Sequence, residues 1–313
     1  MMDVVFCGTP QFAVPTLERL VAAGFRLKLV ATQPDRPKGR GMELTASPVK
    51  QLALKLNLPL TQPETIKNND EFRAQLESLH PEAIIVVGYG RIIPQWMIDL
   101  PPLGNLNLHG SLLPKYRGAA PIQWAVANGE TITGVTTMHI DAGLDTGDIL
   151  LQAEEDIRAD DTALTLAPRL AHTGAELMIK TLAGLEKGTI TRRKQDRAQA
   201  TLAPVLTRQD GRIDFGRTAT DTWNRLRGFQ PWPGAYTSFR GKSLHLHTAL
   251  PTPEVAVVAP GHFAVAGERL LLGFAHGTVL EIRELQLEGK KRMAAHDFIN
   301  GYQPRSDEVV GVP

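Results

Sequence analysis

The sequence predicts an α/β protein, with a doubly wound, mostly parallel, Rossmann-like sheet domain followed by a small all-β domain that forms a barrel. Two observations carry this prediction. In the first part of the chain, short apolar runs alternate with segments of helical periodicity, the pattern of parallel sheets covered by helices. Beyond about residue 208, short strand-like segments separated by Gly and Pro replace that pattern. We therefore expect a sheet domain over 1–188, a linker over 189–207 and a barrel domain over 208–313.

Bulk composition places the chain among ordinary globular proteins. Its 313 residues suffice for two domains, and a net charge of +1 means that a polyanion would have to meet a local basic patch. Cys7 is the only cysteine, which excludes an internal disulfide, and we expect it in a buried strand rather than as a catalytic thiol. Asp3 stands where a signal peptide would be basic, and the apolar run 83–87 is too short for a membrane span. We expect a cytoplasmic protein of bacterial type.

The elements of the sheet domain follow from apolar spacing. Compact apolar runs closed by Gly or Pro predict buried strands, and apolar residues at every third or fourth position predict helices. In parallel sheets ligands bind beyond the carboxyl ends of the strands, so we expect the site in the loops that follow them. The predicted strands are 4–7, 27–32, 83–87, 106–108 and 135–140, and the predicted helices are 12–21, 48–57, 71–79 and 164–185.

The barrel domain is predicted from shorter segments. A short helix is expected within it over 221–227, and Trp232 is expected in its core or at the closure of the barrel. The predicted strands are 211–215, 235–239, 243–248, 255–258, 270–274 and 278–286.

Three polar side chains are candidates for a reaction centre. Asn107 and His109 are two residues apart, so on an extended strand they leave the same face, and Asp145 follows in a glycine-rich turn. An amide can donate to an oxyanion, an imidazole can move protons near neutral pH, and a carboxylate can orient the imidazole. The trio indicates a site that polarises a carbonyl, although an isolated Asn-x-His would more often satisfy backbone groups at a strand end.

The motifs around this trio carry a family resemblance. They are Ser111-Leu112-Leu113-Pro114, Arg117-Gly118-Ala119-Ala120-Pro121-Ile122-Gln123-Trp124, Gly134-Val135-Thr136 and Gly143-Leu144-Asp145-Thr146-Gly147. In order and spacing, over about forty residues, they resemble the 10-formyltetrahydrofolate-dependent formyltransferases. The resemblance implies that Asn107, His109 and Asp145 are catalytic, and that no metal takes part. It also implies a pocket for 10-formyltetrahydrofolate, formed by Ser111, Leu112, Leu113, Pro114, Gly88, Tyr89, Gly90 and Ile92.

Three further stretches resemble the family members that formylate methionyl initiator tRNA, and so support translation initiation. They are 6–13, 32–41 and 225–235, the last resembling the start of an OB-like barrel that binds tRNA. The resemblance implies that the basic loop with Arg36, Lys38 and Arg40 reaches into the tRNA acceptor arm. Met42 and Glu43 follow where relatives often carry lysines, so the loop is less basic than expected. We expect a monomer that binds the folate donor and the tRNA.

Other functions remain as alternatives. A sugar-nucleotide or glycinamide ribonucleotide N-formyltransferase would share the trio and need no tRNA-binding domain. A non-catalytic folate or nucleic-acid binding protein would be expected to lose one of the three side chains. A dehydrogenase is excluded because no Gly-x-Gly-x-x-Gly follows the first predicted strand.

Overall fold

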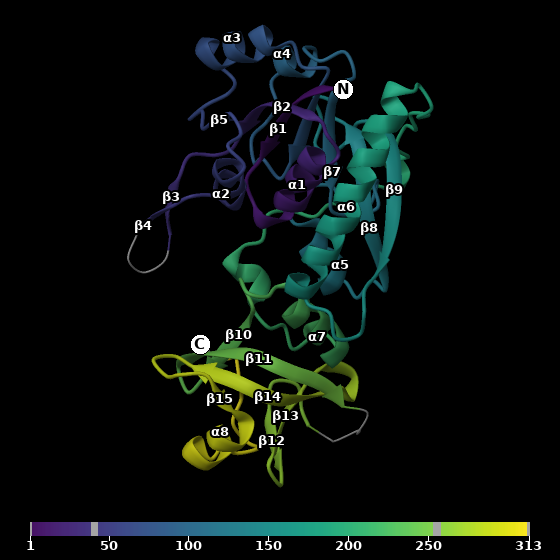
Figure 1. Cartoon of the computed structure of the whole chain (residues 1–313). Helices are drawn as coiled ribbons and strands as arrows, with labels where there is room; N and C mark the ends of the chain where they lie inside the picture. The colour runs from purple at the N-terminus through teal and green to yellow at the C-terminus, as the bar shows by residue number, and fades with distance from the viewer. Residues whose placement is uncertain (1, 39–42, 253–257, 312–313) are drawn as a thin grey trace. The chain divides into compact units, whose positions relative to one another are not determined.

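The computed structural model describes residues 2–38, 43–252 and 258–311. The chain divides into two compact units, which are described separately (Figure 1). The first unit comprises Met1–Pro121, Ile132–Asp156 and Ala167–Pro204, and the second comprises Ile122–Thr131, Ile157–Leu166 and Val205–Pro313.

The first unit is built on a seven-stranded sheet with the order β5-β2-β1-β6-β7-β8-β9. The pairs from β5 to β7 are parallel, whereas β8 and β9 are antiparallel to their neighbours. This confirms the predicted mostly parallel sheet. The strands are β1 (Asp3–Gly8), β2 (Arg26–Ala31), β5 (Leu60–Thr61), β6 (Ala83–Val87), β7 (Asn105–His109), β8 (Ile132–His139) and β9 (Ile149–Asp156), and a separate hairpin pairs β3 (Arg36–Lys38) with β4 (Glu43–Thr45).

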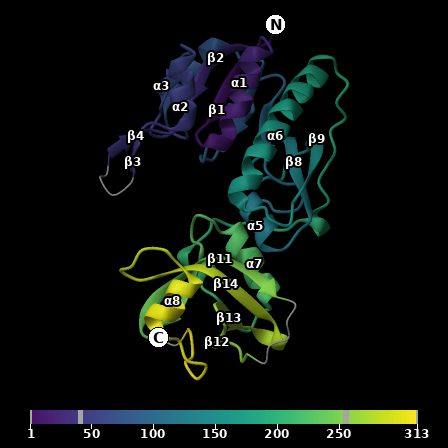
Figure 2. The same ribbon diagram turned by 60° about the horizontal axis from the view of Figure 1, so that its bottom comes forward.

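Helices cover both faces of this sheet. On one face, Phe72 and Leu76 of α3 pack against Val5 and Ile84 in one apolar cluster. On the other face α1 and α6 lie side by side, as Figures 1 and 2 both show. Among the described helices, none combines the length and apolar character that a membrane span requires. The helices are α1 (Val14–Ala22), α2 (Pro48–Lys55), α3 (Asp70–Leu79), α4 (Gln95–Ile98) and α6 (Ala163–Glu186, of which 167–186 belong to this unit), with a 3-10 turn η1 at Gln11–Ala13.

Side-chain caps explain where two of these helices begin. The Ser47 hydroxyl accepts a hydrogen bond from the Lys50 N–H, and Pro48 occupies the first turn of α2. The Asn69 side chain accepts from the Phe72 N–H at the start of α3. These caps satisfy N–H groups that the first helical turn leaves without an internal partner.

Strand β9 was not predicted, and its presence has a physical reason. Only nine residues, 140–148, separate β8 from β9. A parallel crossover needs a dozen residues or more, so the chain can only turn back as an antiparallel pair. Only the first residues of this strand are apolar, Ile149-Leu150-Leu151 before Gln152. The stretch therefore lacks the alternation of apolar and polar residues that would predict a strand.

The second unit contains an antiparallel sheet with the order β10-β11-β14-β13-β12, and β15 pairs with β14. This confirms the prediction of a small C-terminal β domain, whereas its closure into an OB-like barrel stays a prediction. A reciprocal capping box between Thr218 and Asp221 starts α7. The elements are α5 (Pro121–Ala127), η2 (Arg197–Gln199, in the first unit), η3 (Arg208–Gly211), α7 (Ala219–Gly228), β10 (Ala235–Phe239), β11 (Lys242–Thr252), β12 (Phe263–Ala266), β13 (Arg269–Gly273), η4 (Ala275–Gly277), β14 (Val279–Leu287), β15 (Met293–Ala294) and α8 (Ala295–Tyr302).

One sequence prediction for this unit is wrong, and a second is wrong in part. Residues 211–215 form no strand, because η3 and a single bridge between Arg212 and Tyr236 take their place. Trp232 is 55% exposed and so does not lie in the core, which is filled instead by phenylalanines such as Phe239 and Phe298; its place at the closure of the barrel stays a prediction. Of the strand predicted at 255–258, only Val258 lies within the described residues.

The boundaries of the two units differ from the predicted domains. Within the second unit, the Trp124 and Phe229 rings lie 5.1 Å apart, edge to face. The buried Arg227 guanidinium donates to the Asp161 carbonyl oxygen over 2.7 Å. These contacts assign 122–131 and 157–166 to the second unit. The predicted linker instead belongs to the first unit as far as Pro204.

Cys7 is expected to be inert toward thiol reagents in the native protein. Its side chain is completely buried in β1, and burial raises the pKa of the thiol to about 12. Because the thiolate is the reactive species, Ellman's reagent at pH 8 should label the protein only after denaturation in guanidinium chloride. Stoichiometric labelling of the native protein on mixing would contradict this buried position.

Candidate active site

The end of β7 presents two of the predicted catalytic side chains on one face of the sheet. Asn107 and His109 are separated by one residue, so both point to the same side of the strand. Asn107 pairs in register with Val86, a member of the apolar cluster beneath α3. The two side chains therefore lie on the α3 face, opposite α6, at the carboxyl edge of the parallel strands.

The imidazole of His109 is held at one ring nitrogen and faces a carboxylate with the other. The ring is only 6% exposed, and its Nε2 lies 2.8 Å from the Tyr116 carbonyl oxygen. A carbonyl oxygen can only accept, so Nε2 carries the proton in this hydrogen bond. Nδ1 faces the Asp145 carboxylate, with 3.6 Å between Nδ1 and Oδ2. This arrangement leaves Nδ1 as the nitrogen available to exchange a proton.

Asp145 reaches His109 from the opposite edge of the sheet. Because β8 is antiparallel to β7, it ends where β7 begins, and the Ile140 N–H donates to the Asn105 carbonyl there. The loop 141–147 that follows must fold back along the sheet to bring Asp145 to His109. The sequence-based expectation that this loop leaves from the carboxyl edge of the strands is therefore wrong.

The backbone of Asp145 adopts a conformation that few L-residues accept. Its φ is +51°, in the left-handed region, where Asp and Asn are among the tolerated residues. Asp145 Oδ2 accepts a hydrogen bond from the Gly118 N–H over 2.8 Å. Gly118 itself has φ +120°, and a Cβ there would lie 2.7 Å from the Ala203 carbonyl oxygen. The carboxylate thus joins the 141–147 loop to the motif that begins at Arg117.

The Asn107 carboxamide differs from the other two groups because it is unpaired. It is half-buried, and among the described residues no hydrogen-bond partner of this side chain is found. Asn105, on the same face, donates instead to the Met97 and Ile98 carbonyls at 2.7 and 3.1 Å. Asn107 therefore retains a free N–H donor on the α3 face of β7, which suits the binding of a substrate oxygen.

The segment Ser111–Pro114, predicted to line a folate pocket, is largely buried in the protein. The Ser111 hydroxyl donates to the Lys115 carbonyl over 2.7 Å, and Leu113 packs with Met138 and Ile149. Leu112 and Pro114 are half-buried. Ser111 and Leu113 therefore fix the course of the segment, which leaves Leu112 and Pro114 as the side chains that could touch a ligand.

The loop 88–92, predicted to form another wall of that pocket, is shaped by Gln33. The Gln33 amide donates to the Tyr89 and Gly90 carbonyls, at 2.9 and 3.2 Å. A Cβ at Gly90 would lie 2.6 Å from Gln33 Nε2, and Gly88 and Gly90 both have positive φ. The Tyr89 ring is buried in the core, and desolvation raises the pKa of its phenol, so only its backbone can meet a ligand. Ile92 is 91% exposed.

The predicted tRNA-binding residues fall on the β3–β4 hairpin. Arg36 is exposed on β3, Lys38 ends this strand, and Arg40 lies outside the described residues. The strand is anchored at its start by Asp35, which pairs with Lys50 Nζ at 2.5 Å. The hydrogen bond from Lys50 lowers the pKa of Asp35, and one from Gln62 assists. This anchor fixes the point at which the β3–β4 hairpin begins.

Sequence analysis missed the contribution of the stretch it treated as a linker. Two sequence motifs meet at Asp145, the loop 143–147 and the segment that begins at Arg117. The stretch 189–207 hydrogen-bonds to both of them or to the residue beside them, through Gln195, Thr201 and Ala203. A glutamine in a polar tract carries no distinguishing signal when one sequence is considered alone. Arg117 stands out in the sequence only as part of a motif, yet the structure buries this charged residue, which is 8% exposed.

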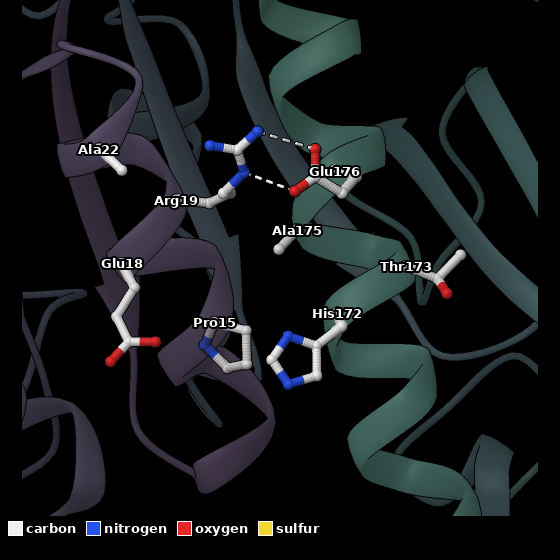
Figure 3. A pocket seen from close by; sticks show the side chains of 8 residues that line it. All are labelled: Pro15, Glu18, Arg19, Ala22, His172, Thr173, Ala175 and Glu176. Atoms are coloured by element: carbon white, nitrogen blue, oxygen red, sulfur yellow. Dashed lines mark hydrogen bonds and ion pairs between the residues drawn. The ribbon is translucent and has the colours of Figure 1, made fainter.

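A hollow of about 420 Å³ lies between α1 and α6 (Figure 3). The Arg19 guanidinium is paired there with the Glu176 carboxylate, and the His172 ring points into the same space. Of the described residues that line it, none is a predicted site residue. Its groups come from helices rather than from the ends of strands, so this hollow is separate from the Asn107–His109 face.

The second unit carries a basic cavity of about 870 Å³. Its wall includes the Tyr236 ring, with the Arg208 guanidinium 5.6 Å from the ring centroid. Asp214 is its one acidic lining residue among those described. The cations that line it are Arg208, Arg212, Arg217, Arg225 and Lys242.

Comparisons with known proteins agree on one family. The family described as "Formyl transferase" matches residues 2–182, and "Formyl transferase, C-terminal domain" matches residues 205–303. Methionyl-tRNA formyltransferase of Koribacter versatilis is 65% identical, over 99% of both chains. The enzyme of the same name from Acidobacterium capsulatum is 64% identical, over 96% of both chains.

Solved structures share the fold at low identity. A sugar 3N-formyl transferase, WlaRD, has a TM-score of 0.67 and 19% identity, covering 93% of this chain and 99% of its own. HypX of Aquifex aeolicus, solved with tetrahydrofolic acid, has a TM-score of 0.62 and 18% identity, covering 96% of this chain and 47% of its own. The solved structures show the same fold, and the matches to the family models and to the full-length relatives show that the chain belongs to the formyl transferase family.

Proposed function

We propose that the protein transfers a formyl group from 10-formyltetrahydrofolate to the α-amine of methionyl initiator tRNA. The observation that carries this proposal is the meeting of three groups: the unpaired Asn107 amide, the buried His109 ring and the Asp145 carboxylate 3.6 Å from that ring. The name shared by relatives at 64–65% identity over nearly the whole chain supports the choice of acceptor.

The proposed mechanism follows from the donors and acceptors of the trio. The neutral amine forms a bond to the formyl carbon, and negative charge develops on the formyl oxygen. The free N–H of Asn107 donates to that oxygen. The bond between the formyl carbon and N10 of the donor then breaks, the amine loses one proton and N10 gains one. His109 moves this proton through Nδ1, and Asp145 orients the ring and stabilises its charged form.

The proposed reaction needs neither a covalent enzyme intermediate nor a metal. We therefore attribute much of the rate enhancement to the binding of the two substrates in the orientation that the reaction requires. The backbone of 88–90 and the half-buried Leu112 and Pro114 are proposed to contact the folate, and Ile92 to cover its ring. Glycines at 88 and 90 let the chain pass close to a flat ring. The site is contributed by one chain, so we propose an active monomer that works in the cytoplasm on charged tRNA.

Two basic surfaces are proposed to bind the tRNA. The β3–β4 hairpin, with Arg36, Lys38 and Arg40, is proposed to contact the acceptor arm. The cavity lined by Arg208, Arg212 and Lys242 in the second unit offers further contacts to phosphates, and Tyr236 offers a ring on which a base can stack. Because these contacts are to phosphates, the apparent affinity for tRNA should fall as salt rises.

The decisive experiment compares acceptors with purified protein and 10-formyltetrahydrofolate. Methionyl initiator tRNA should be formylated with a kcat/KM at least about 100-fold above that of methionyl elongator tRNA, a factor that corresponds to about 2.7 kcal/mol. Formylated aminoacyl-tRNA can be followed by acid gel or mass spectrometry. A dTDP-amino sugar and glycinamide ribonucleotide serve as the competing acceptors. Preferential formylation of either small acceptor would overturn the proposal.

A further inference from the structure

The stretch 193–203, here called the strap, forms part of the wall behind the trio. At one end, Arg193 makes an antiparallel bridge with Ile149. At the other, the Arg117 N–H donates to the Thr201 carbonyl over 2.8 Å, and the Ala203 N–H donates to the Arg117 carbonyl over 2.7 Å. The strap is therefore tied at one end to the strand that follows the Asp145 loop, and at the other end to Arg117, the neighbour of Gly118.

Gln195 uses its whole side-chain amide to join these segments. Its Nε2 donates to the carbonyl oxygens of Asp145 and Gly147, each over 2.8 Å. Its Oε1 accepts from Nε and Nη2 of Arg117, at 3.0 and 2.7 Å. The orientation of the amide is unambiguous, because a guanidinium can only donate and a carbonyl can only accept.

The loop that carries Asp145 needs such an anchor. It starts at the edge of the sheet opposite to His109, and its chain is irregular over 141–147. Within the loop, the Asp141 carboxylate accepts from the Gly143 N–H and the Thr146 hydroxyl, which holds the tip only. Asp145 also adopts a left-handed φ that must be imposed by its surroundings. The two bonds from Gln195 fix the backbone on either side of Thr146.

We propose that Gln195 is a positioning residue for formyl transfer. It holds the Asp145 backbone so that the carboxylate stays beside Nδ1 of His109, and it ties this position to the buried Arg117. The inference rests on the proposed catalytic role of Asp145. Small displacements of a reacting group can cost about 100-fold in rate, so the expected effect is on kcat rather than on substrate binding.

The test uses Gln195→Glu, which keeps an oxygen acceptor for Arg117 but removes both N–H donors to the loop. We expect kcat to fall about 10- to 100-fold, with the KM values for folate and tRNA within about threefold of the parent enzyme. Gln195→Ala should show the same fall in kcat and also a lower Tm, because Arg117 then loses its acceptor. The matched control is Gln199→Ala, an exposed strap residue that bonds only Asp196 among the described residues, and it should retain full activity.

Hydrogen exchange tests the position of the Asp145 loop without relying on enzyme activity. Hydrogen exchange of the Gly118 amide, which donates to Asp145 Oδ2, should accelerate at least about tenfold in Gln195→Glu, because the carboxylate is no longer held. Exchange at the strap ends should not change. An unchanged Gly118 amide, or a fall in kcat that only follows the loss of folded protein, would overturn the positioning role.

A double mutant separates this inference from the proposed function. If Gln195 acts through Asp145, then Gln195→Glu should cause no further loss in an Asp145→Asn background. Losses that multiply would contradict the inference and leave the proposed function intact. If Asp145→Asn alone left formyl transfer unchanged, the catalytic assignment of Asp145, on which the inference rests, would fail with it.

Discussion

Replacing His109 by alanine is expected to lower kcat for formyl transfer by about 100- to 10,000-fold, the usual contribution of a general acid–base group. The reason lies in the ring's contacts. Nε2 is committed to the Tyr116 carbonyl, so Nδ1, facing Asp145, is the nitrogen that can exchange a proton. Without the ring, the amine proton would have to leave through solvent. Single-turnover formylation at saturating folate and tRNA measures this step directly.

Binding should survive this substitution, although stability should not be fully retained. The Tyr116 carbonyl loses its donor in a buried place, which costs about 1–3 kcal/mol of unfolding free energy. His172→Ala is the matched control, because His172 is exposed on α6 beside the hollow of Figure 3, and it should leave kcat unchanged. A His109→Ala enzyme with more than about a tenth of parental kcat would remove His109 from the mechanism.

Replacing Asn107 by alanine is expected to lower kcat about 100- to 1000-fold, equivalent to about 2.7–4 kcal/mol of transition-state stabilisation. The carboxamide has no hydrogen-bond partner among the described residues, so its donor is available to a developing oxyanion. For the same reason, its removal should scarcely change the free energy of unfolding. Asn107→Asp, which keeps the shape and removes the N–H donor, should be as impaired as alanine. Steady-state kinetics together with thermal denaturation separate the two effects.

Asn105 provides a control of the same residue type on the same face of the same strand. Its amide donates to the Met97 and Ile98 carbonyls in the interior. Asn105→Ala should therefore reduce stability by about 1–3 kcal/mol and leave kcat per folded molecule near the parental value. If Asn107→Ala instead lost stability and kept kcat, the amide would be a structural group and the oxyanion role would be wrong.

Much of the fold of the first unit was accessible from the sequence because its signals are local. The strand predicted over 83–87 coincides with β6, since five successive apolar residues closed by glycine leave little choice. The long helix predicted over 164–185 differs from α6 by one residue at each end. The direction of β8 was not accessible in this way, because strand direction depends on pairing with distant residues rather than on periodicity.

The candidate site was accessible only in part, for a similar reason. The spacing of Asn107 and His109 predicts a common face, and the motif around Asp145 identifies the third group. The route by which the loop 141–147 brings Asp145 to His109 depends on the antiparallel direction of β8. It also depends on Gln195, fifty residues further along the chain than Asp145. Hydrogen bonds between side chains and distant carbonyls leave no pattern in a single sequence, so the polar composition of the strap predicts only a linker.

The left-handed backbone conformation of Asp145 limits which amino acids a saturation-mutagenesis library at position 145 would return as folded, active variants. Most L-side chains cost about 1–2 kcal/mol at such a φ, so they would be penalised before their chemistry was tried. Glycine would accept the conformation without supplying an acceptor, and asparagine would supply a neutral one. The left-handed conformation at position 145 thus restricts the substitutions that this position can accept, independently of the need for a negative charge.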